Sequence, residues 1–138
     1  MDVPATRATF EAALEGLVAV NVALMRTRSQ LPPLYASGVR YQRERGTERW
    51  QTCEQVFSAR VGDCEDLASA FVALCMVVGI PARVVWLEQP GAPLNHVSAQ
   101  VRTDPARPDE WLWMETTIPG ARLGENPYAA LQRLGEQF

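Results

Sequence analysis

The chain has 138 residues and a formal net charge of −3, and 47% of its residues are hydrophobic. A chain of this length can form a single core, so we expect one domain over residues 1–138. The charge excludes a strongly basic nucleic-acid binder, and no run approaches the ~18 apolar residues that span a bilayer. The N-terminus does not resemble a Sec signal, and we expect a cytoplasmic protein without nucleic-acid or membrane partners.

The sequence holds three widely spaced cysteines, Cys53, Cys64 and Cys75, and no C-x-x-C pair. An odd, dispersed set suits neither a disulfide scaffold nor a zinc ribbon, so we expect free thiols, no metal and no cofactor. The only histidine is His96, and all thirteen basic residues are arginines. The absence of lysine excludes a lysine Schiff base and leaves few groups for catalysis.

The first predicted element is a mostly apolar helix over residues 6–28, because apolar residues recur through it at helical spacing. A proline pair, Pro32 and Pro33, ends this region. The stretch 40–50 is dense in charge and is expected to be a solvated loop. A short helix over 53–58 is expected to follow it.

A second long helix is predicted to begin at Cys64. Asp63 is a typical N-cap residue, and Gly79 followed by Pro81 is a typical helix end. Apolar residues recur at three- and four-residue steps after the cysteine, which is the spacing of one buried helix face. The residues of this face are Leu67, Phe71, Leu74, Cys75 and Val78.

Cys64 therefore falls in the first turn of this helix, where free N–H groups and the helix dipole favour a thiolate. Gly62, just before it, is expected to leave room for a substrate backbone. The nearby carboxylates of Asp63, Glu65 and Asp66 oppose ionisation, because negative charge raises the pKa of a thiol. A cationic partner is needed for a reactive thiolate; otherwise Cys64 is a small buried hydrophobic residue.

Beyond the second long helix the pattern becomes extended. Strands are predicted over 83–87, 96–102 and 111–116, with a turn at 90–93. The middle strand alternates between apolar and polar residues, which predicts one apolar and one polar face. A final short helix is expected over 127–135.

A helix-borne cysteine, a histidine that opens a strand and a carboxylate on the following strand occur in the order of a thiol acyl-transfer triad. Facing side chains on adjacent antiparallel strands lie ~5 Å apart, so His96 and Glu115 can be neighbours. Glu115 would then hold His96 toward Cys64 and favour the imidazolium. On this hypothesis His96 acidifies the thiol in spite of the acidic residues around it.

Each of these residues also has a simpler interpretation. His96 can be a surface histidine on a polar strand face, and Glu115 can be an ordinary solvent-facing carboxylate. Trp50 and Gln51 carry an indole and an amide N–H that can stabilise an oxyanion, or they serve only packing and surface roles.

Four segments together resemble the transglutaminase-like superfamily of papain-fold cysteine enzymes, most closely its small bacterial and phage-associated members. They are Gly62–Ala68, Gly79–Val85, His96–Val97 and Trp113–Thr117. The resemblance implies an α+β fold with a cysteine-bearing helix packed on an antiparallel sheet, and a catalytic core over about residues 50–117. It makes Cys64 the nucleophile, His96 the general base and Glu115 the third acid. The family usually has aspartate and proline where this sequence has Glu115 and Thr116, and an aromatic residue where Val97 stands.

The resemblance leaves the reaction open, because the superfamily includes proteases, amidases, acyl transferases and members without catalysis. We expect hydrolysis of a peptide or side-chain amide. An amine-accepting transglutaminase must exclude water from its thioester, and this sequence offers little material for a lid. The other alternative is a non-catalytic structural or binding domain of phage or prophage type. The expected partners are a protein or peptide substrate, or phage-particle proteins in a virion-associated protein.

Overall fold

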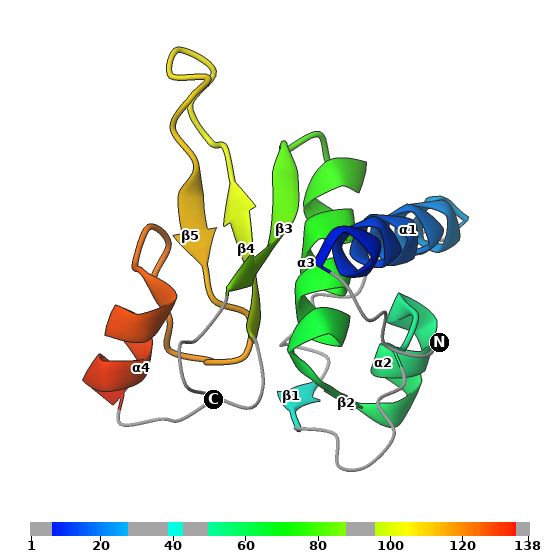
Figure 1. Ribbon diagram of the computed structural model, residues 1–138. Coiled ribbons are helices and arrows are strands. Elements are labelled where there is room, and N and C mark those ends of the chain that lie inside the picture. The colour runs from blue at the N-terminus through cyan, green and yellow to red at the C-terminus, as the bar shows by residue number, and fades with distance from the viewer. Residues whose placement is uncertain (1–6, 28–38, 43–49, 88–95, 135–138) are drawn as a thin grey trace.

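The computed structural model describes residues 7–27, 39–42, 50–87 and 96–134 (Figure 1). The elements in chain order are α1 (Arg7–Arg26), β1 (Arg40–Tyr41), α2 (Cys53–Ala59), β2 (Val61–Gly62), α3 (Cys64–Val77), β3 (Ala82–Leu87), β4 (His96–Val101), β5 (Leu112–Met114) and α4 (Pro127–Leu134).

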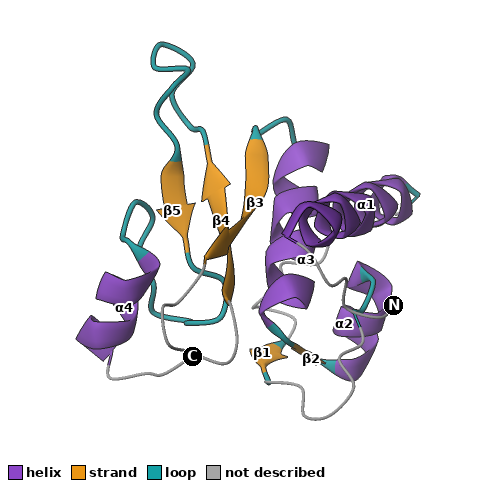
Figure 2. Ribbon diagram, in the orientation of Figure 1, coloured by secondary structure: helices purple, strands orange, loops and turns teal. Residues whose placement is uncertain are grey.

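The fold is α+β, and α3 is the element between its two halves. One side of α3 packs on the antiparallel sheet of β3, β4 and β5, and another side packs on α1 (Figures 1 and 2). The predicted fold class, a cysteine-bearing helix on an antiparallel sheet, is confirmed. α3 is buried on more than one side because α1 and the sheet each bury an apolar face against it.

α1 contributes an apolar face to this core. Its buried hydrophobic residues recur at three- and four-residue steps, as the face of an amphipathic helix does. They are Phe10, Leu14, Leu17, Val18, Val22 and Met25. Val20, on the opposite side, is exposed. None of the described helices is long and apolar enough to cross a membrane.

Both ends of α3 are fixed by local hydrogen bonds. Asp63 is the N-cap, and the side chain of Asp66 accepts the Asp63 N–H at 3.1 Å, which completes a capping box. At the other end Gly79 has φ +87°, and Ile80 donates its N–H to the Cys75 carbonyl at 2.8 Å. The predicted place of Val78 on the buried face is wrong, because it caps the helix and is 63% exposed.

β4 is the central strand of the three-stranded sheet, and all six of its residues are buried. The predicted polar face of this strand is therefore not solvated. β4 is paired along both edges, and on this face Gln100 lies between the side chains of Arg83 of β3 and Trp113 of β5. A polar face inside a protein must be hydrogen-bonded, and Arg83 donates to the Gln100 side chain at 2.9 Å.

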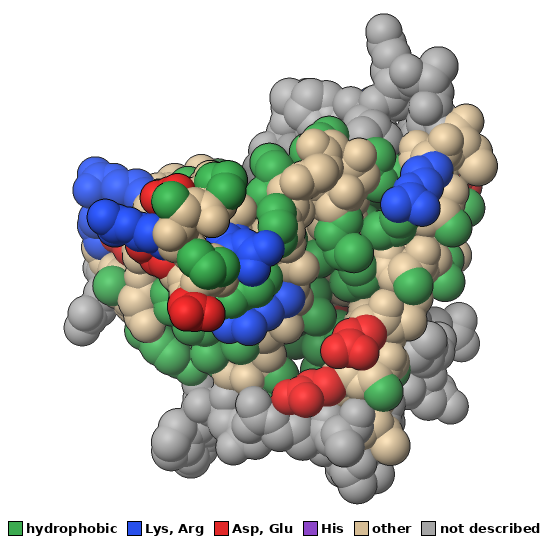
Figure 3. All heavy atoms as spheres, turned by 90° about the horizontal axis from the view of Figure 1, so that it is seen from above, with side chains coloured by type: hydrophobic (Ala, Val, Ile, Leu, Met, Phe, Trp, Pro, Cys, Tyr) green, Lys and Arg blue, Asp and Glu red, His purple; other side chains and the backbone are tan. Residues whose placement is uncertain are grey.

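The end of the sheet with the β4–β5 connection carries exposed charge. The ring of Trp111 lies 4.1 Å from the Arg83 guanidinium carbon and 5.5 Å from that of Arg102. In the same connection Arg107 pairs with Glu110 at 3.2 Å. Figure 3, seen from above and so toward this end, shows basic and acidic side chains side by side. Exposed pairs of this kind stabilise a fold by only ~0–1 kcal/mol.

One short pairing is not predicted by the sequence. β1 pairs in parallel with β2, with Arg40 opposite Val61 and Tyr41 opposite Gly62. A strand of two residues has no periodicity to detect, and the charge around Arg40 indicates a loop instead. The rest of that charged stretch, residues 43–49, and the predicted turn at 90–93 lie outside the described residues.

Candidate active site

Cys64, His96 and Glu115 lie at one end of the layered structure. Cys64 is the first residue of α3, His96 is the first residue of β4, and Glu115 directly follows the last residue of β5. Figure 1 shows that α3 and β4 start, and β5 ends, at the end of the sheet away from the β4–β5 connection. The chain topology thus brings the three predicted site residues to one end.

His96 and Glu115 form a buried hydrogen-bonded pair. Nε2 of His96 lies 2.8 Å from both carboxylate oxygens of Glu115. The side chains are 3% and 0% exposed, so the alternatives of a surface histidine and a solvent-facing carboxylate are wrong. Thr117 donates its backbone N–H at 3.3 Å and its hydroxyl to Glu115 Oε2. Because Nε2 donates to Glu115, Nδ1 is the ring nitrogen that can accept a proton.

The pair forms diagonally across the sheet. β4 and β5 are registered with Ala99 opposite Met114. Continued by one residue, this register places Glu115 beside Ser98, so that the carboxylate reaches back to His96 at a diagonal position. The longer side chain of glutamate suits this reach better than that of aspartate.

The pKa of Glu115 is lower than its ordinary value. Burial by itself raises it, but the hydrogen bond from His96, the charge of the imidazolium and the hydrogen bonds from Thr117 together outweigh burial. Glu115 is therefore ionised at neutral pH.

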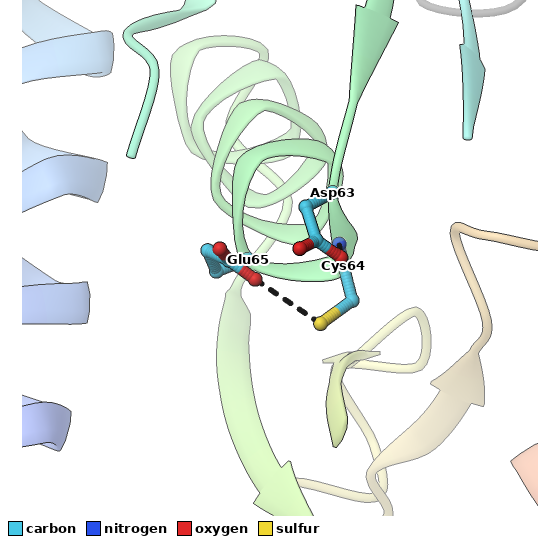
Figure 4. A group of neighbouring side chains, drawn as sticks. All are labelled: Asp63, Cys64 and Glu65. Atoms are coloured by element: carbon cyan, nitrogen blue, oxygen red, sulfur yellow. Dashed lines mark hydrogen bonds between the residues drawn. The ribbon is translucent and has the colours of Figure 1, made fainter. Parts of the chain in front are cut away.

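The thiol of Cys64 is buried and hydrogen-bonded. Its Sγ donates to Glu65 Oε2 at 3.2 Å, as Figure 4 shows. Burial first, and then the charges of Glu65 and Asp63, raise the pKa of the thiol well above its ordinary value, while the backbone N–H of Val97 acts in the opposite direction. The predicted acidified thiol is wrong for this arrangement, in which Cys64 is protonated at neutral pH. The Val97 contact still places the sulfur beside the residue that follows His96.

Among the described residues, one group of side chains has the donor atoms to bind a metal ion. It consists of Asp63, Cys64 and Glu65. Their side-chain donor atoms all lie within 4.8 Å of one another (Figure 4). Asp63 accepts the N–H of Cys64 at 2.7 Å as the helix cap, and Glu65 accepts the thiol hydrogen. Both carboxylates of the group thus already accept a hydrogen bond from Cys64.

Trp50 and Gln51 differ in their availability as oxyanion donors. Trp50 is buried in the same apolar cluster as Cys64, and its indole N–H has no hydrogen-bond partner among the described residues. The side-chain amide of Gln51 donates to Asp66 Oδ2 at 3.1 Å and to the Val61 carbonyl at 3.3 Å. Because the amide of Gln51 is engaged, Trp50 is the stronger candidate.

Asp66 ties the Trp50–Gln51 segment to the first turn of α3. In addition to the amide of Gln51 it accepts the backbone N–H of Gln51 at 2.7 Å and that of Asp63 at 3.1 Å. Burial raises its pKa from 3.8 to about 6 in spite of these three donors. The hydrogen bonds to Gln51 are a role that the sequence did not indicate, because Asp66 was considered only as part of the helix start and as an acidic neighbour of Cys64.

Replacing Asp66 with asparagine is expected to change how stability depends on pH. A group whose pKa is raised on folding, here from 3.8 to about 6, stabilises the fold most below its unfolded pKa. That contribution, roughly 3 kcal/mol, is lost as the pH rises through its folded pKa. The variant has no such carboxyl group and does not lose this contribution. Measured by urea unfolding, the free energy of unfolding of Asp66→Asn should therefore rise relative to that of the wild type between pH 4.5 and pH 7.5. Asp104→Asn, on an exposed connection, is the control. A difference that stays constant with pH contradicts this interpretation of Asp66.

Two further residues have roles that the sequence analysis did not give them. Thr117 holds Glu115, a role that the Glu-x-Thr spacing signals only once Glu115 is known to be buried. Gly62 was expected to make room for substrate. It is buried instead, and a Cβ there would lie 3.1 Å from Asp66 Cβ and from Leu67 Cδ2. The glycine is needed for packing against α3.

An α+β domain in which a cysteine-bearing helix packs on an antiparallel sheet is the architecture of transglutaminase-like domains. Comparison with family models matches residues 31–116 to the transglutaminase-like superfamily. The match covers more than half of the chain, and the chain therefore belongs to this superfamily, which comprises cysteine-dependent acyltransferases and proteases. Searches of the curated proteins and of the solved structures found no match.

Proposed function

We propose that the protein is a thiol-dependent acyl-transfer enzyme that hydrolyses peptide or side-chain amide bonds. Cys64 is the nucleophile, His96 the general base and Glu115 the residue that orients His96. The buried His96–Glu115 pair carries the proposal. Burying an ionisable pair costs desolvation energy, and such pairs concentrate at functional sites. This one lies at the start of β4, beside the strand residue whose N–H faces the Cys64 sulfur.

In the proposed reaction the thiol proton passes to Nδ1 of His96, and Sγ attacks the carbonyl carbon of the amide. The indole N–H of Trp50 stabilises the oxyanion that forms. The C–N bond then breaks as the imidazolium returns the proton to the leaving amine, and a thioester remains on Cys64. Water gives a proton to His96 and attacks the thioester, which releases the acid and restores the thiol. Glu115 stays ionised throughout.

Two other functions differ from this one in a measurable way. The raised pKa of the Cys64 thiol favours a non-catalytic structural or protein-binding domain, for which a phage or prophage particle is the setting we infer. An amine-accepting transglutaminase would use the same thioester but transfer the acyl group to an amine instead of water.

A peptide-library screen with a fluorescent primary amine present is the test. We expect cleavage or deamidation by the wild type and by Cys75→Ala, which removes a buried thiol from the same helix, and loss of activity in Cys64→Ala. Amine incorporation that outpaces hydrolysis would instead support a transglutaminase. No difference between wild type and Cys64→Ala across a broad screen would favour the non-catalytic domain.

A further inference from the structure

Glu65 is a buried carboxylate that the proposed reaction does not use. It is 1% exposed, and its Oε2 accepts the thiol hydrogen of Cys64 at 3.2 Å. A carboxylate is rarely buried so completely without a partner that requires it. Figure 4 shows the Glu65 side chain turned toward the sulfur.

The described residues around the thiol include few other charged groups. The α1 side chains in the cluster around Cys64 are apolar, as are those of the neighbouring β4 and α3 residues: Phe10, Leu14, Leu17, Val97 and Ala68. Of the residues that the structure describes, the titratable groups near the thiol are Asp63 and Glu65 of α3, the His96–Glu115 pair of the sheet, and Tyr41, which packs against the cluster. Asp66 is turned to Gln51. Among the acidic side chains, Glu65 is the one with a hydrogen bond to the sulfur.

We propose that Glu65 holds the proton on Cys64 in the resting site, and that this hydrogen bond must break before the thiol can attack. An ionised carboxylate accepts a hydrogen bond from a thiol but repels a thiolate, so the contact favours only the protonated state. In a buried site the interaction is strong, because little water screens it. The inference rests on the proposed role of Cys64 as nucleophile, and it makes that nucleophile latent until Glu65 or a bound substrate rearranges.

The matched variants are Glu65→Gln and Asp63→Asn. Both remove one negative charge from the first turn of α3 and keep the side-chain shape. Asparagine is also as good an N-cap as aspartate, so Asp63→Asn should preserve the helix. Of these two carboxylates only Glu65 is hydrogen-bonded to the sulfur, and the glutamine amide at its place can donate to a thiolate.

The experiment is iodoacetamide labelling across a pH series, followed by peptide mapping of all three cysteines. In Glu65→Gln we expect the pH midpoint for Cys64 labelling to fall by about one unit or more, and in Asp63→Asn by less than half as much. Labelling of Cys53 and Cys75, both buried, reports any general loosening of the fold and should not change.

Three results would overturn the proposal: equal midpoints in Glu65→Gln and the wild type, a larger shift in Asp63→Asn, or faster labelling of all three cysteines in parallel. Because labelling needs no substrate, the outcome is independent of the peptide screen. A shifted midpoint together with a negative screen would retain the hydrogen-bond role of Glu65 and reject the proposed enzyme.

Discussion

Replacing Glu115 with alanine is expected to lower the free energy of unfolding by about 3–5 kcal/mol, which is the range for removing one partner of a buried ion pair. The loss is large because Nε2 of His96 and the donors of Thr117 would remain buried without their acceptor. Urea denaturation at pH 7, followed by circular dichroism, measures the change.

Two controls test whether the loss of stability comes from the buried pair. Glu110→Ala removes an exposed carboxylate that pairs with Arg107, and should cost less than ~1 kcal/mol. The second control is pH. The pKa of Glu115 is lowered on folding, so its contribution is complete above the ordinary carboxylate value and is lost as the pH falls through the folded pKa. The difference in free energy of unfolding between the wild type and Glu115→Ala should therefore become smaller at acid pH. If Glu115→Ala lowers the free energy of unfolding as little as Glu110→Ala does, the His96–Glu115 pair contributes little to stability.

Trp50→Phe is expected to reduce kcat by about 10²–10³-fold with little change in KM, the effect typical of removing one oxyanion donor. The indole N–H of Trp50 has no partner among the described residues, so its removal breaks no hydrogen bond of the resting fold. The donor would act only when negative charge develops on the substrate, and for that reason kcat should fall while KM holds. The substrate found in the peptide screen is used for this measurement.

Trp86→Phe is the matched control for the size of the ring. Trp50 and Trp86 both contact Phe10, with ring centroids 5.1 and 4.7 Å from it. Both substitutions remove an indole from one aromatic cluster and should destabilise the fold through lost packing. Only Trp50→Phe should reduce kcat strongly. Equal falls in kcat would show that the effect comes from packing and not from the N–H.

The cysteine-bearing helix could be predicted closely because its signals are local. Asp63, Asp66 and Gly79 lie in or beside the helix itself, and they fix its ends through hydrogen bonds within a few residues. The final helix, Pro127–Leu134, also begins and ends near the predicted residues. Val78 was misplaced because a residue that caps a helix no longer follows the helical spacing.

The geometry of the site was harder to predict from the sequence. The order of the strands indicates that His96 and Glu115 can meet, but the register that makes their contact diagonal depends on the β4–β5 connection. The burial of the polar face of β4 comes from its tertiary surroundings, which no pattern within the strand reveals.

The protonation state of the thiol depends on a single side-chain conformation. Glu65 could have pointed to solvent, and the helix dipole would then have faced less opposition. In the structure it turns to the sulfur. Side-chain direction at a helix N-terminus depends on contacts with other elements, and the local sequence does not specify it.

The hydrogen bonds of Asp66 have a consequence for how the site assembles. They join residues 15 positions apart, so the nucleophile and the Trp50 segment form one local unit. The His96–Glu115 contact joins residues 19 positions apart in a hairpin and forms a second. Short loops close at low entropic cost, so each unit can organise by itself early in folding. The complete site exists only after the two dock through the apolar seam between α3 and β4, where Leu67 and Ala99 are fully buried. Catalytic geometry therefore depends on this seam, which contains none of the reacting groups, and a cavity there would separate the nucleophile from its base.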